Sequence, residues 1–187
     1  MRNLFSLNYS ISNWPHHLNY RLAPLEKTDW EPIRLWRNSQ LSILRQNHPL
    51  SLQEQENYWQ KQSSLSPTQS HLFCFSYKEN EKSLGYGGFV HIDFETASAE
   101  LSSLLDPSFS EPSPLFLKIS EVFLRLSLEL AHQLGLKKLT AEAYDHRLDF
   151  ISLLYKLGFQ CTGYLPERKL YNGINYGSWC FEINTLK

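Results

Sequence analysis

The sequence predicts an α+β fold in which a mixed, mostly antiparallel central sheet of about seven strands packs against about four helices. Three observations support this prediction. Short strand-like stretches alternate with longer stretches in which apolar residues recur at helical spacing. Three strand-like segments follow one another in the middle of the chain, as in an antiparallel meander. An Asn172-Gly173 dipeptide near the end marks a tight hairpin.

Length and composition fit a single domain over residues 1–187, with residues 1–19 as an N-terminal arm. The chain has 187 residues, of which 42% are hydrophobic and 14% aromatic, enough to close a sizeable core. The formal net charge is -1, so no global field favours binding to nucleic acid or to an anionic membrane. We therefore expect neither nucleic acid nor membrane as a partner.

Cysteine and histidine usage indicates a reduced protein without a metal. Cys74, Cys161 and Cys180 are odd in number and lack metal-type spacing, which favours free thiols and a cytoplasmic location. The seven histidines form no ligand pattern with them. No apolar run approaches the ~20 residues of a spanning helix, so neither membrane insertion nor secretion is expected.

The first half of the chain predicts a strand, two helices and three strands. Residues 20–23 have strand character. Residues 28–31 (Thr-Asp-Trp-Glu) have the capping-box form that starts a helix, which we expect to end near Asn38. Residues 51–54 (Ser-Leu-Gln-Glu) start a second helix in the same way. The three strand candidates lie at residues 72–77, 84–94 and 97–105.

The second half predicts helix, strand, helix and hairpin. Apolar residues recur at helical spacing from Ile119 to Leu130, and Gly135 follows as a C-cap. Residues 138–144 form a strand, and a second apolar stripe begins at Phe150 and ends before Gly158. Because a long helix connects the strand ending near residue 105 to the strand at 138–144, these two strands should be parallel neighbours with a right-handed crossover. The closing hairpin comprises residues 159–171 and 174–183.

Three motifs within this order of elements carry a family resemblance. The segment 152–159 (Ser-Leu-Leu-Tyr-Lys-Leu-Gly-Phe) is similar to the helix end that leads into the sixth strand of the GNAT N-acetyltransferase superfamily. Residues 99–107 resemble the family's fourth strand as it runs toward the pyrophosphate loop. Residues 36–38 (Trp-Arg-Asn) are similar to a first-helix motif of members that acetylate amino-sugar nucleotides. The resemblance extends from about residue 20 to 183 and implies the GNAT fold.

The resemblance implies acetyl-CoA as co-substrate, bound where the parallel fourth and fifth strands splay apart after Leu104. Backbone N–H groups at Leu104, Leu105 and Asp106 would polarise the thioester carbonyl. The phenol of Tyr155 would face the sulfur and protonate the leaving thiolate, since its reference pKa of ~10 keeps it protonated. In a leucine-rich helix the simpler interpretation of Tyr155 is a core residue with its hydroxyl at the surface.

The loop that should hold the CoA pyrophosphate departs from the family pattern. Its three pattern positions are Ser110, Ser113 and Leu115, without the glycines that allow close backbone approach, and two intervening prolines remove N–H donors. Serine hydroxyls and the remaining donors at a helix start would have to serve. Leu148 stands where many members carry a CoA-contacting asparagine, so Arg147 or His146 is expected to supply the polar contact.

Acetylation also needs a proton acceptor, because only ~0.1% of an alkyl ammonium is free amine near pH 7. Glu100 on the fourth strand and His91 on the third are equal candidates, Glu100 working by a raised pKa or through water. Asp93 shares the strand with His91 and is a substrate-binding candidate. The simpler alternatives are that Glu100 pairs with a lysine and that His91 and Asp93 face water. The Gly-rich residues 85–88 indicate a twisted strand rather than a phosphate loop.

The acceptor is the least determined part of the prediction. Trp36, Arg37 and Asn38 favour an amino-sugar nucleotide, although they could equally complete a helix end. A protein N-terminal amine or another small-molecule amine is an alternative acceptor. A GNAT-like binding domain without catalysis is an alternative from another class, supported by the glycine-free loop. Oligomeric state is open, a homodimer included.

Overall fold

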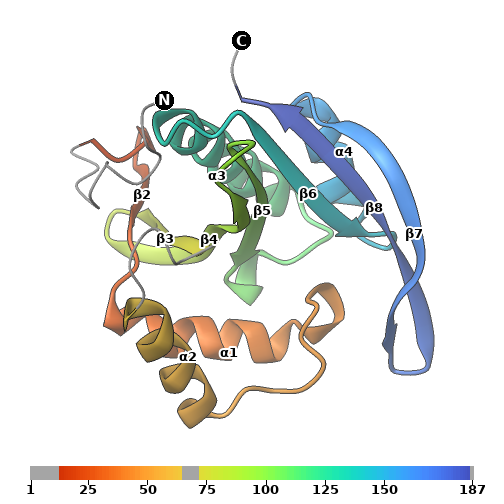
Figure 1. Ribbon diagram of the computed structural model, residues 1–187. Coiled ribbons are helices and arrows are strands. Elements are labelled where there is room, and N and C mark those ends of the chain that lie inside the picture. Colours follow the sequence, from red (N-terminus) through yellow and green to blue (C-terminus); the bar gives the residue numbers. More distant parts are fainter. Residues whose placement is uncertain (1–12, 65–71, 186–187) are drawn as a thin grey trace.

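The computed structural model describes residues 13–64 and 72–185 and contains one eight-stranded sheet in the order β1-β2-β3-β4-β5-β6-β8-β7 (Figure 1). The mixed, mostly antiparallel sheet confirms the predicted fold class, with a two-residue β1 added at one edge. The N-terminal arm lies largely outside the described residues. The strands are β1 (His16–His17), β2 (Tyr20–Pro24), β3 (Leu72–Glu79), β4 (Lys82–Asp93), β5 (Ser98–Leu105), β6 (Lys138–Tyr144), β7 (Gln160–Tyr171) and β8 (Ile174–Asn184).

Within the described ranges, four α-helices accompany the sheet: α1 (Trp30–Ser39), α2 (Leu52–Ser64), α3 (Pro114–Gln133) and α4 (Leu148–Lys156). Short 3-10 turns lie at Lys27–Asp29, Leu41–Ile43 and Pro107–Phe109. Among the described residues, none of the helices combines the length and the apolarity that crossing a membrane requires.

Most helix and turn signals act as predicted. In the Ser51 capping box, the Ser51 amide donates to Glu54 Oε2 at 2.7 Å and the Glu54 amide donates to Ser51 Oγ at 3.2 Å. Gly135 and Gly158 end α3 and α4 with positive φ of 78° and 92°. Asn172-Gly173 joins β7 to β8 with φ values of 50° and 79°, the left-handed pair that a tight hairpin requires.

The first helix begins differently from the prediction. The capping box is formed by Glu26 and Asp29, with the Glu26 amide donating to Asp29 Oδ2 at 2.9 Å, and not by Thr28 and Glu31. A 3-10 turn precedes α1. The box caps this turn first, so the regular helix begins at Trp30, one residue later than a Thr28 N-cap would start it.

The parallel strands β5 and β6 pair over only three positions. Ser98, Ala99 and Glu100 oppose Lys138, Leu139 and Thr140, and beyond these the two strands separate. The predicted parting after Leu104 is therefore corrected to a parting after Glu100. The reason is competition between ladders: β5 stays paired with β4 to Leu105, whereas β6 is paired with β8 along its whole length. Each strand follows its antiparallel partner as the sheet twists.

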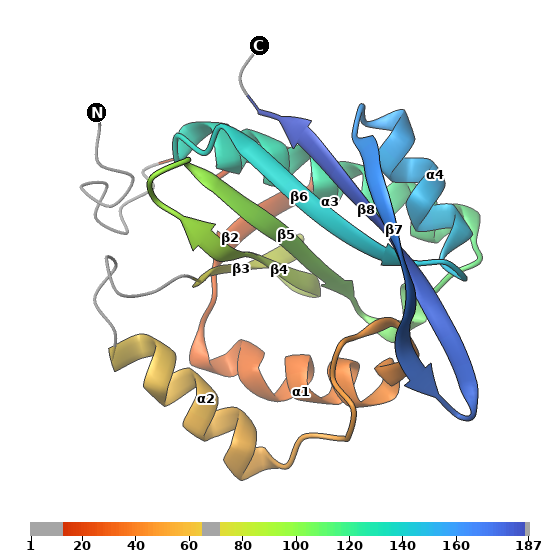
Figure 2. The same cartoon turned by 45° about the vertical axis from the view of Figure 1, so that its right-hand side comes forward.

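The two faces of the sheet carry different helices (Figure 2). One face packs against α3 and α4, whose residues Phe116, Phe123, Phe150 and Leu154 belong to the main core. On the other face, Ile33 of α1 packs in a second, smaller core. That small core contains Tyr86 of β4 and Leu104 of β5. The parting of β5 and β6 thus lies between two helical layers.

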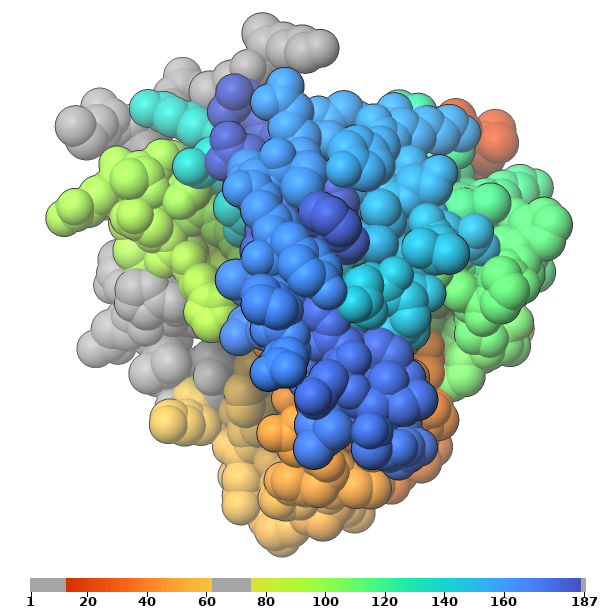
Figure 3. Space-filling model, turned by 90° about the vertical axis from the view of Figure 1, so that its right-hand side faces the viewer, coloured from red at the N-terminus to blue at the C-terminus, as the bar shows by residue number. Residues whose placement is uncertain are grey.

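The β7–β8 hairpin extends past the sheet and meets the segment that follows α1 (Figure 3). Lys169 of β7 is 5% exposed and donates from Nζ to the carbonyl oxygens of Leu41 at 2.6 Å and Gln46 at 2.8 Å, and also to that of Leu44. The hairpin therefore holds residues 41–46 close to the opening between β5 and β6.

Candidate active site

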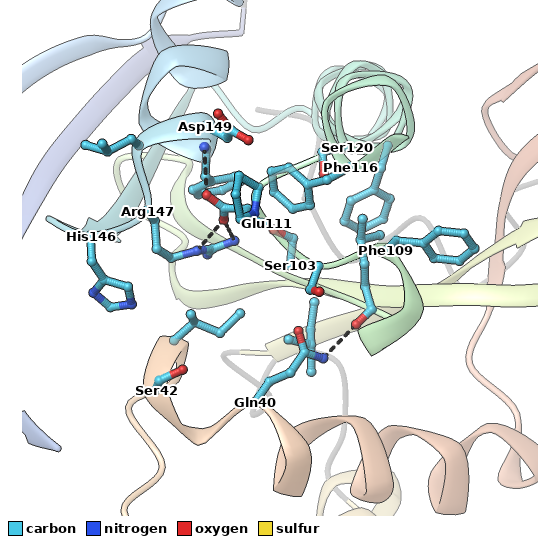
Figure 4. A pocket seen from close by; sticks show the side chains of 18 of the residues that line it. Gln40, Ser42, Ser103, Phe109, Glu111, Phe116, Ser120, His146, Arg147 and Asp149 are labelled. Carbon is cyan, nitrogen blue, oxygen red and sulfur yellow. Dashed lines mark hydrogen bonds and ion pairs between the residues drawn. The ribbon is translucent and has the colours of Figure 1, made fainter. Parts of the chain in front are cut away.

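A cavity of about 500 Å³ opens where β5 and β6 part. It lies between the end of α1, the C-terminal half of β5 and the starts of α3 and α4 (Figure 4). Gln40, the residue after α1, reaches into it and donates to the carbonyl of Leu105 at 2.9 Å. We call it the donor cavity. Its lining includes Gln40, Ser103, Leu104, Leu105, Phe109, Ser110, Glu111, Phe116, Ser120, His146, Arg147 and Phe150.

The edge of β5 that faces the gap carries backbone N–H groups. Asp106 donates its amide to the Leu84 carbonyl at 2.8 Å, which fixes the alternation of the antiparallel ladder. Because the direction of the backbone N–H groups alternates along a strand, those of Ser102 and Leu104 bond to β4. Those of Ser103 and Leu105 point the opposite way, toward the gap. Both residues line the donor cavity. The gap is therefore bordered by donors that could hold a carbonyl oxygen.

A buried ion pair occupies one end of the donor cavity. Arg147 is 9% exposed, and its guanidinium donates to Glu111 Oε1 from Nε at 2.8 Å and lies 2.7 Å from it through a terminal nitrogen. Glu111 Oε2 accepts the Phe150 amide at 3.3 Å and so caps α4 (Figure 4). The guanidinium also stacks over the Phe150 ring at 4.3 Å. Arg147 thus lines the donor cavity, and its charge is neutralised by Glu111.

The loop predicted to hold pyrophosphate is largely occupied with its own structure. Ser113 caps α3 by accepting the Phe116 amide at 3.0 Å, and Asp106 caps the following 3-10 turn through Ser108. Leu115 is exposed, and of the three pattern positions Ser110 alone lines the donor cavity. These contacts leave few N–H donors for a phosphate at the start of α3.

A second cavity, about 210 Å³, adjoins the first on the α1 side of the sheet. Ile43, Ser103, Arg147 and Phe150 line both cavities. Glu100 and Glu142 also line the second one, and Arg45 pairs with both of them, at 2.8 Å for Glu100. We call this space the acidic cavity. It places the predicted candidate Glu100 beside the opening between the strands.

Glu142 stays ionised at any ordinary pH. Its burial opposes ionisation, but hydrogen bonds from Arg168 at 2.8 Å and Ser178 at 2.7 Å, together with Arg45, outweigh burial and hold its pKa at about 2. Because Arg45 and Arg168 both pair with this carboxylate, its negative charge is neutralised within the cavity wall.

The other polar candidates from the meander lie at the surface. His91 lies in a β-bulge of β4, with a side chain 73% exposed, and its Nε2 is 4.0 Å from Glu100 Oε2. Asp93 closes the turn after β4 by accepting the amides of Glu95 at 2.9 Å and Thr96 at 3.3 Å. His91 is thus near Glu100 without lining the acidic cavity, and Asp93 serves a turn.

The three residues of the Trp-Arg-Asn motif, 36–38, make different contacts. Trp36 packs against the small core, and Asn38 is bonded to the backbone of Leu50 through both its amide nitrogen (2.8 Å) and its oxygen (2.7 Å). Arg37 donates to Tyr86 Oη at 2.6 Å and to Gln46 Oε1 at 2.8 Å. Of the three, Arg37 alone lines described cavities.

A third cavity, about 340 Å³, continues from the acidic cavity between α1, α2 and β4. Arg37, Val90 and Ser102 line both. We call it the aromatic cavity, because Tyr58, Trp59 and Tyr86 form much of its wall. Nothing in the sequence had marked α2 as part of a site.

Tyr155 is not brought to any of these cavities. Its side chain is 53% exposed, its ring meets the edge of Phe181 with centroids 5.2 Å apart, and its hydroxyl bonds to the Cys161 side chain. Leu154, one residue earlier, is fully buried. A helical step rotates a side chain by about 100°, which turns Tyr155 away from the core-facing side of α4.

Several site residues were missed because no local pattern marks them. Gln40, Arg45, Glu111 and Glu142 are ordinary polar residues in sequence, and each acquires its position from a partner far along the chain. His146 was a sequence candidate and lines the donor cavity, where burial and the Arg147 charge lower its pKa. Cys161 and Cys180 are free thiols. No group of three metal-ligating side chains occurs within residues 13–64 and 72–185.

Comparison with known proteins establishes the fold. No protein-family profile and no curated protein sequence matches the chain significantly. Among solved structures, a spermidine N-acetyltransferase from Vibrio cholerae in complex with CoA and spermine aligns with a TM-score of 0.79 at 18% identity, over 90% of this chain and 97% of that one. An N-acetyltransferase from Staphylococcus aureus Mu50 aligns with a TM-score of 0.70 at 18% identity, over 89% and 99%. The chain thus has the GNAT fold that the sequence motifs implied.

Proposed function

We propose that the protein is an acetyl-CoA-dependent N-acetyltransferase that acts on a small primary amine. One observation carries the proposal: the free edge of β5 lies between the donor cavity and the acidic cavity, which share Ser103 as lining. A thioester bound at that edge from the donor cavity could be attacked by an amine that enters through the acidic cavity. The CoA and spermine in the Vibrio cholerae structure support a donor and an amine of this kind.

In the proposed reaction the amine nitrogen bonds to the thioester carbonyl carbon and the carbon–sulfur bond breaks. The departing thiolate takes up the second proton that the nitrogen releases, so the products are an amide and a thiol. The N–H groups of Ser103 and Leu105 would donate to the carbonyl oxygen as negative charge develops on it. Glu100, which shares Arg45 with Glu142, would attract the ammonium form of the acceptor. Glu100 would take the proton through water, with His91 as the next acceptor outward. Tyr155 has no part in this scheme.

The donor cavity fits the thioester end of acetyl-CoA better than its diphosphate end. Gln40 and the β5 edge supply hydrogen-bonding groups at the gap. Arg147 is the cation placed to meet a phosphate, but Glu111 already neutralises it. We propose that Arg147 exchanges Glu111 for phosphate on binding, with Ser110 as a further contact. The free thiols of Cys161 and Cys180 support a cytoplasmic setting for the enzyme.

An amino-sugar nucleotide remains an alternative acceptor that rests on Arg37, since Trp36 and Asn38 are engaged in packing and loop contacts. A protein N-terminal amine is a second alternative. A binding domain without catalysis is the alternative from another class, and the buried Glu111–Arg147 pair favours it because a carboxylate opposes phosphate binding.

Calorimetric titration with acetyl-CoA followed by a thiol-release assay tests the proposal. We expect saturable binding and thiol release that depends on an added primary amine. Glu100→Gln should lower turnover at least tenfold with little change in acetyl-CoA affinity. Absence of binding at high micromolar acetyl-CoA would favour the binding-domain alternative, and binding without amine-dependent thiol release would refute the transferase.

A further inference from the structure

We infer that the acceptor is an amino acid, a molecule with both a primary amine and a carboxylate, and that Arg37 binds the carboxylate. This inference deepens the proposed function, on which it rests, by naming the class of amine. It is carried by the partners of the arginines and by the position of Arg37 at the junction of two cavities.

Arg37 differs from the other arginines within the described ranges. Each of those has a carboxylate oxygen 2.5–2.8 Å from a guanidinium nitrogen, in the pairs Arg21–Glu81, Arg34–Glu31, Arg45–Glu100, Arg125–Glu121, Arg147–Glu111 and Arg168–Glu142. Arg37 donates instead to two neutral oxygens, from Nη1 to Tyr86 Oη at 2.6 Å and from Nε to Gln46 Oε1 at 2.8 Å. Among the residues that the structure describes, its positive charge has no carboxylate in contact.

One end of the Arg37 guanidinium is open. Neither of the two hydrogen bonds uses Nη2. In the described part of the chain, Trp59 Nε1 is the one enclosed side-chain nitrogen or oxygen without a partner, so Nη2 of the partly buried Arg37 retains access to solvent. Its N–H groups are therefore available to a bound molecule.

The guanidinium lies between α1 and the sheet. Arg37 belongs to α1, whereas the Tyr86 hydroxyl that it contacts comes from β4. Arg37 lines both the acidic cavity and the aromatic cavity, together with Val90 and Ser102 of the sheet. An anionic group of a molecule in either cavity can thus meet the open end of this guanidinium.

The charges around the two cavities favour an acceptor without net charge. The charged residues that line them, with their ion-pair partners, balance: Arg37, Arg45, Arg147 and Arg168 against Glu54, Glu100, Glu111 and Glu142. A diamine would bring two positive charges into this neutral lining. An amino acid brings one charge of each sign, so its ammonium can face Glu100 while its carboxylate faces Arg37.

The carboxylate of Glu54 does not take the place of the ligand. Glu54 lines the aromatic cavity, but its Oε2 accepts the Ser51 amide at 2.7 Å and the Ser51 hydroxyl at 2.8 Å. It forms no ion pair with Arg37 among the described residues. Glu54 thus caps α2, and the guanidinium is left for the acceptor.

A carboxylate is the anion that matches a single guanidinium. The N–H groups of a guanidinium lie in one plane and form charge-assisted hydrogen bonds with carboxylate oxygens. A carboxylate also carries one negative charge, equal and opposite to that of Arg37. A phosphate monoester carries close to two near pH 7 and would leave negative charge uncompensated.

Matched pairs of acceptors test the inference. β-Alanine, 4-aminobutyrate and L-phenylalanine are each compared with their own carboxamide, which keeps the shape and removes the charge. With acetyl-CoA and the full-length protein, kcat/KM for at least one acid should exceed that for its carboxamide about tenfold or more. For L-phenylalanine the comparison is conservative, because the amine of the carboxamide is less basic and more of it is unprotonated.

Variants of two arginines on the same helix separate binding from a structural role. In Arg37→Met the ratio of kcat/KM for acid and carboxamide should fall to about one, with acetyl-CoA affinity unchanged. Arg37→Lys keeps the charge without the planar fork and should retain part of the preference. Arg34→Met is the control, because Arg34 pairs with Glu31, and its ratio should equal that of the wild type. A merely structural Arg37 would lower activity on acid and carboxamide alike and leave the ratio unchanged.

The outcomes separate this inference from the transferase activity. Equal use of every acid and its carboxamide by the wild type, a ratio that Arg37→Met leaves unchanged, or a higher kcat/KM for putrescine than for any of the acids overturns the inference while the transferase stands. A higher kcat/KM for 2-aminoethyl phosphate than for β-alanine overturns the carboxylate in favour of phosphate.

Failure to bind acetyl-CoA overturns the transferase, and calorimetric titration with the acids and carboxamides alone then decides the role of Arg37. Tighter binding of an acid than of its carboxamide by the wild type, lost in Arg37→Met, supports the inference, and equal binding contradicts it. If Arg37→Met does not fold, Arg37→Lys and the wild-type ratio decide.

Discussion

At the scale of single residues, Tyr155 illustrates how one helical step decides a role. Its phenol lies against Phe181 and Cys161, outside the described cavities. Tyr155→Phe should therefore change acetyl-transfer turnover by less than twofold and stability by less than about 0.5 kcal/mol. Steady-state kinetics and urea unfolding check this. A tenfold loss of turnover would return the phenol to the reaction.

The lowered pKa of Glu142 should make the free energy of unfolding depend on pH. Its pKa of about 2 lies below the ordinary value of 4.5, so its contribution is complete above pH 4.5 and is lost as the pH falls toward 2. Glu142→Gln should lower the free energy of unfolding at pH 7 by on the order of 2 kcal/mol. The difference from wild type should shrink between pH 4.5 and 2. Thermal unfolding across this range tests it, and a difference independent of pH would contradict the assignment.

The sequence predicted some of the residues that line the cavities but not their ion-pair partners. Glu100 and Arg147 do line cavities, since a strand position and a helix start constrain where a side chain can go. Glu111 and Arg45 could not be found, because their importance comes from partners 36 and 55 positions away. Such ion pairs leave no periodic trace in a sequence.

At the scale of elements, the glycine-rich part of β4 packs closely against α3. A Cβ on Gly87 would lie 2.6 Å from Phe123 Cζ and 2.9 Å from the Ser102 carbonyl oxygen. Gly87→Ala should therefore destabilise the protein by about 1–3 kcal/mol. Gly163→Ala is the control, because a Cβ on Gly163 would meet no other atom within 4 Å among the described residues, and the change should be near neutral. Urea unfolding of both variants decides, and equal stability would refute the packing argument.

Lys169 connects the β7–β8 hairpin to the loop that carries Arg45. Lys169→Met keeps the apolar stem but leaves the carbonyls of residues 41, 44 and 46 without their donor. We expect a loss of about 1–3 kcal/mol, faster amide exchange in residues 41–46 and a raised KM for the acceptor. Lys138→Met removes an exposed pair with Glu182 and should be near neutral. Unaltered exchange in the loop would contradict the connection.

Local signals predicted the elements well and their relative placement less well. Capping boxes, helical spacing and the Asn-Gly turn are short-range, so α2, α3 and the hairpin appear where expected. The point where β5 and β6 part depends on how far β8 pairs with β6, which involves residues about 40 positions apart. A pattern along one strand cannot encode that competition.

At the scale of the whole molecule, the fold creates the site by separating two strands that begin as neighbours. The main core with α3 and α4 holds one side of the gap, and α1 with the hairpin-anchored loop holds the other. Three adjoining cavities follow from this arrangement. The sequence predicted that β5 and β6 part and that the phenol of Tyr155 lies in the opening. The strands do part, but Tyr155 lies outside the described cavities, so the proposed activity rests on the edge of β5.

The central claim is that a thioester binds at the free edge of β5, and backbone amide NMR during titration with acetyl-CoA tests it most directly. The amides of Ser103 and Leu105, which face the gap, should shift strongly. The amides of Ser102 and Leu104, which bond to β4, serve as internal controls and should shift much less. Equal shifts along the strand, or shifts confined to residues outside the donor cavity, would contradict the account.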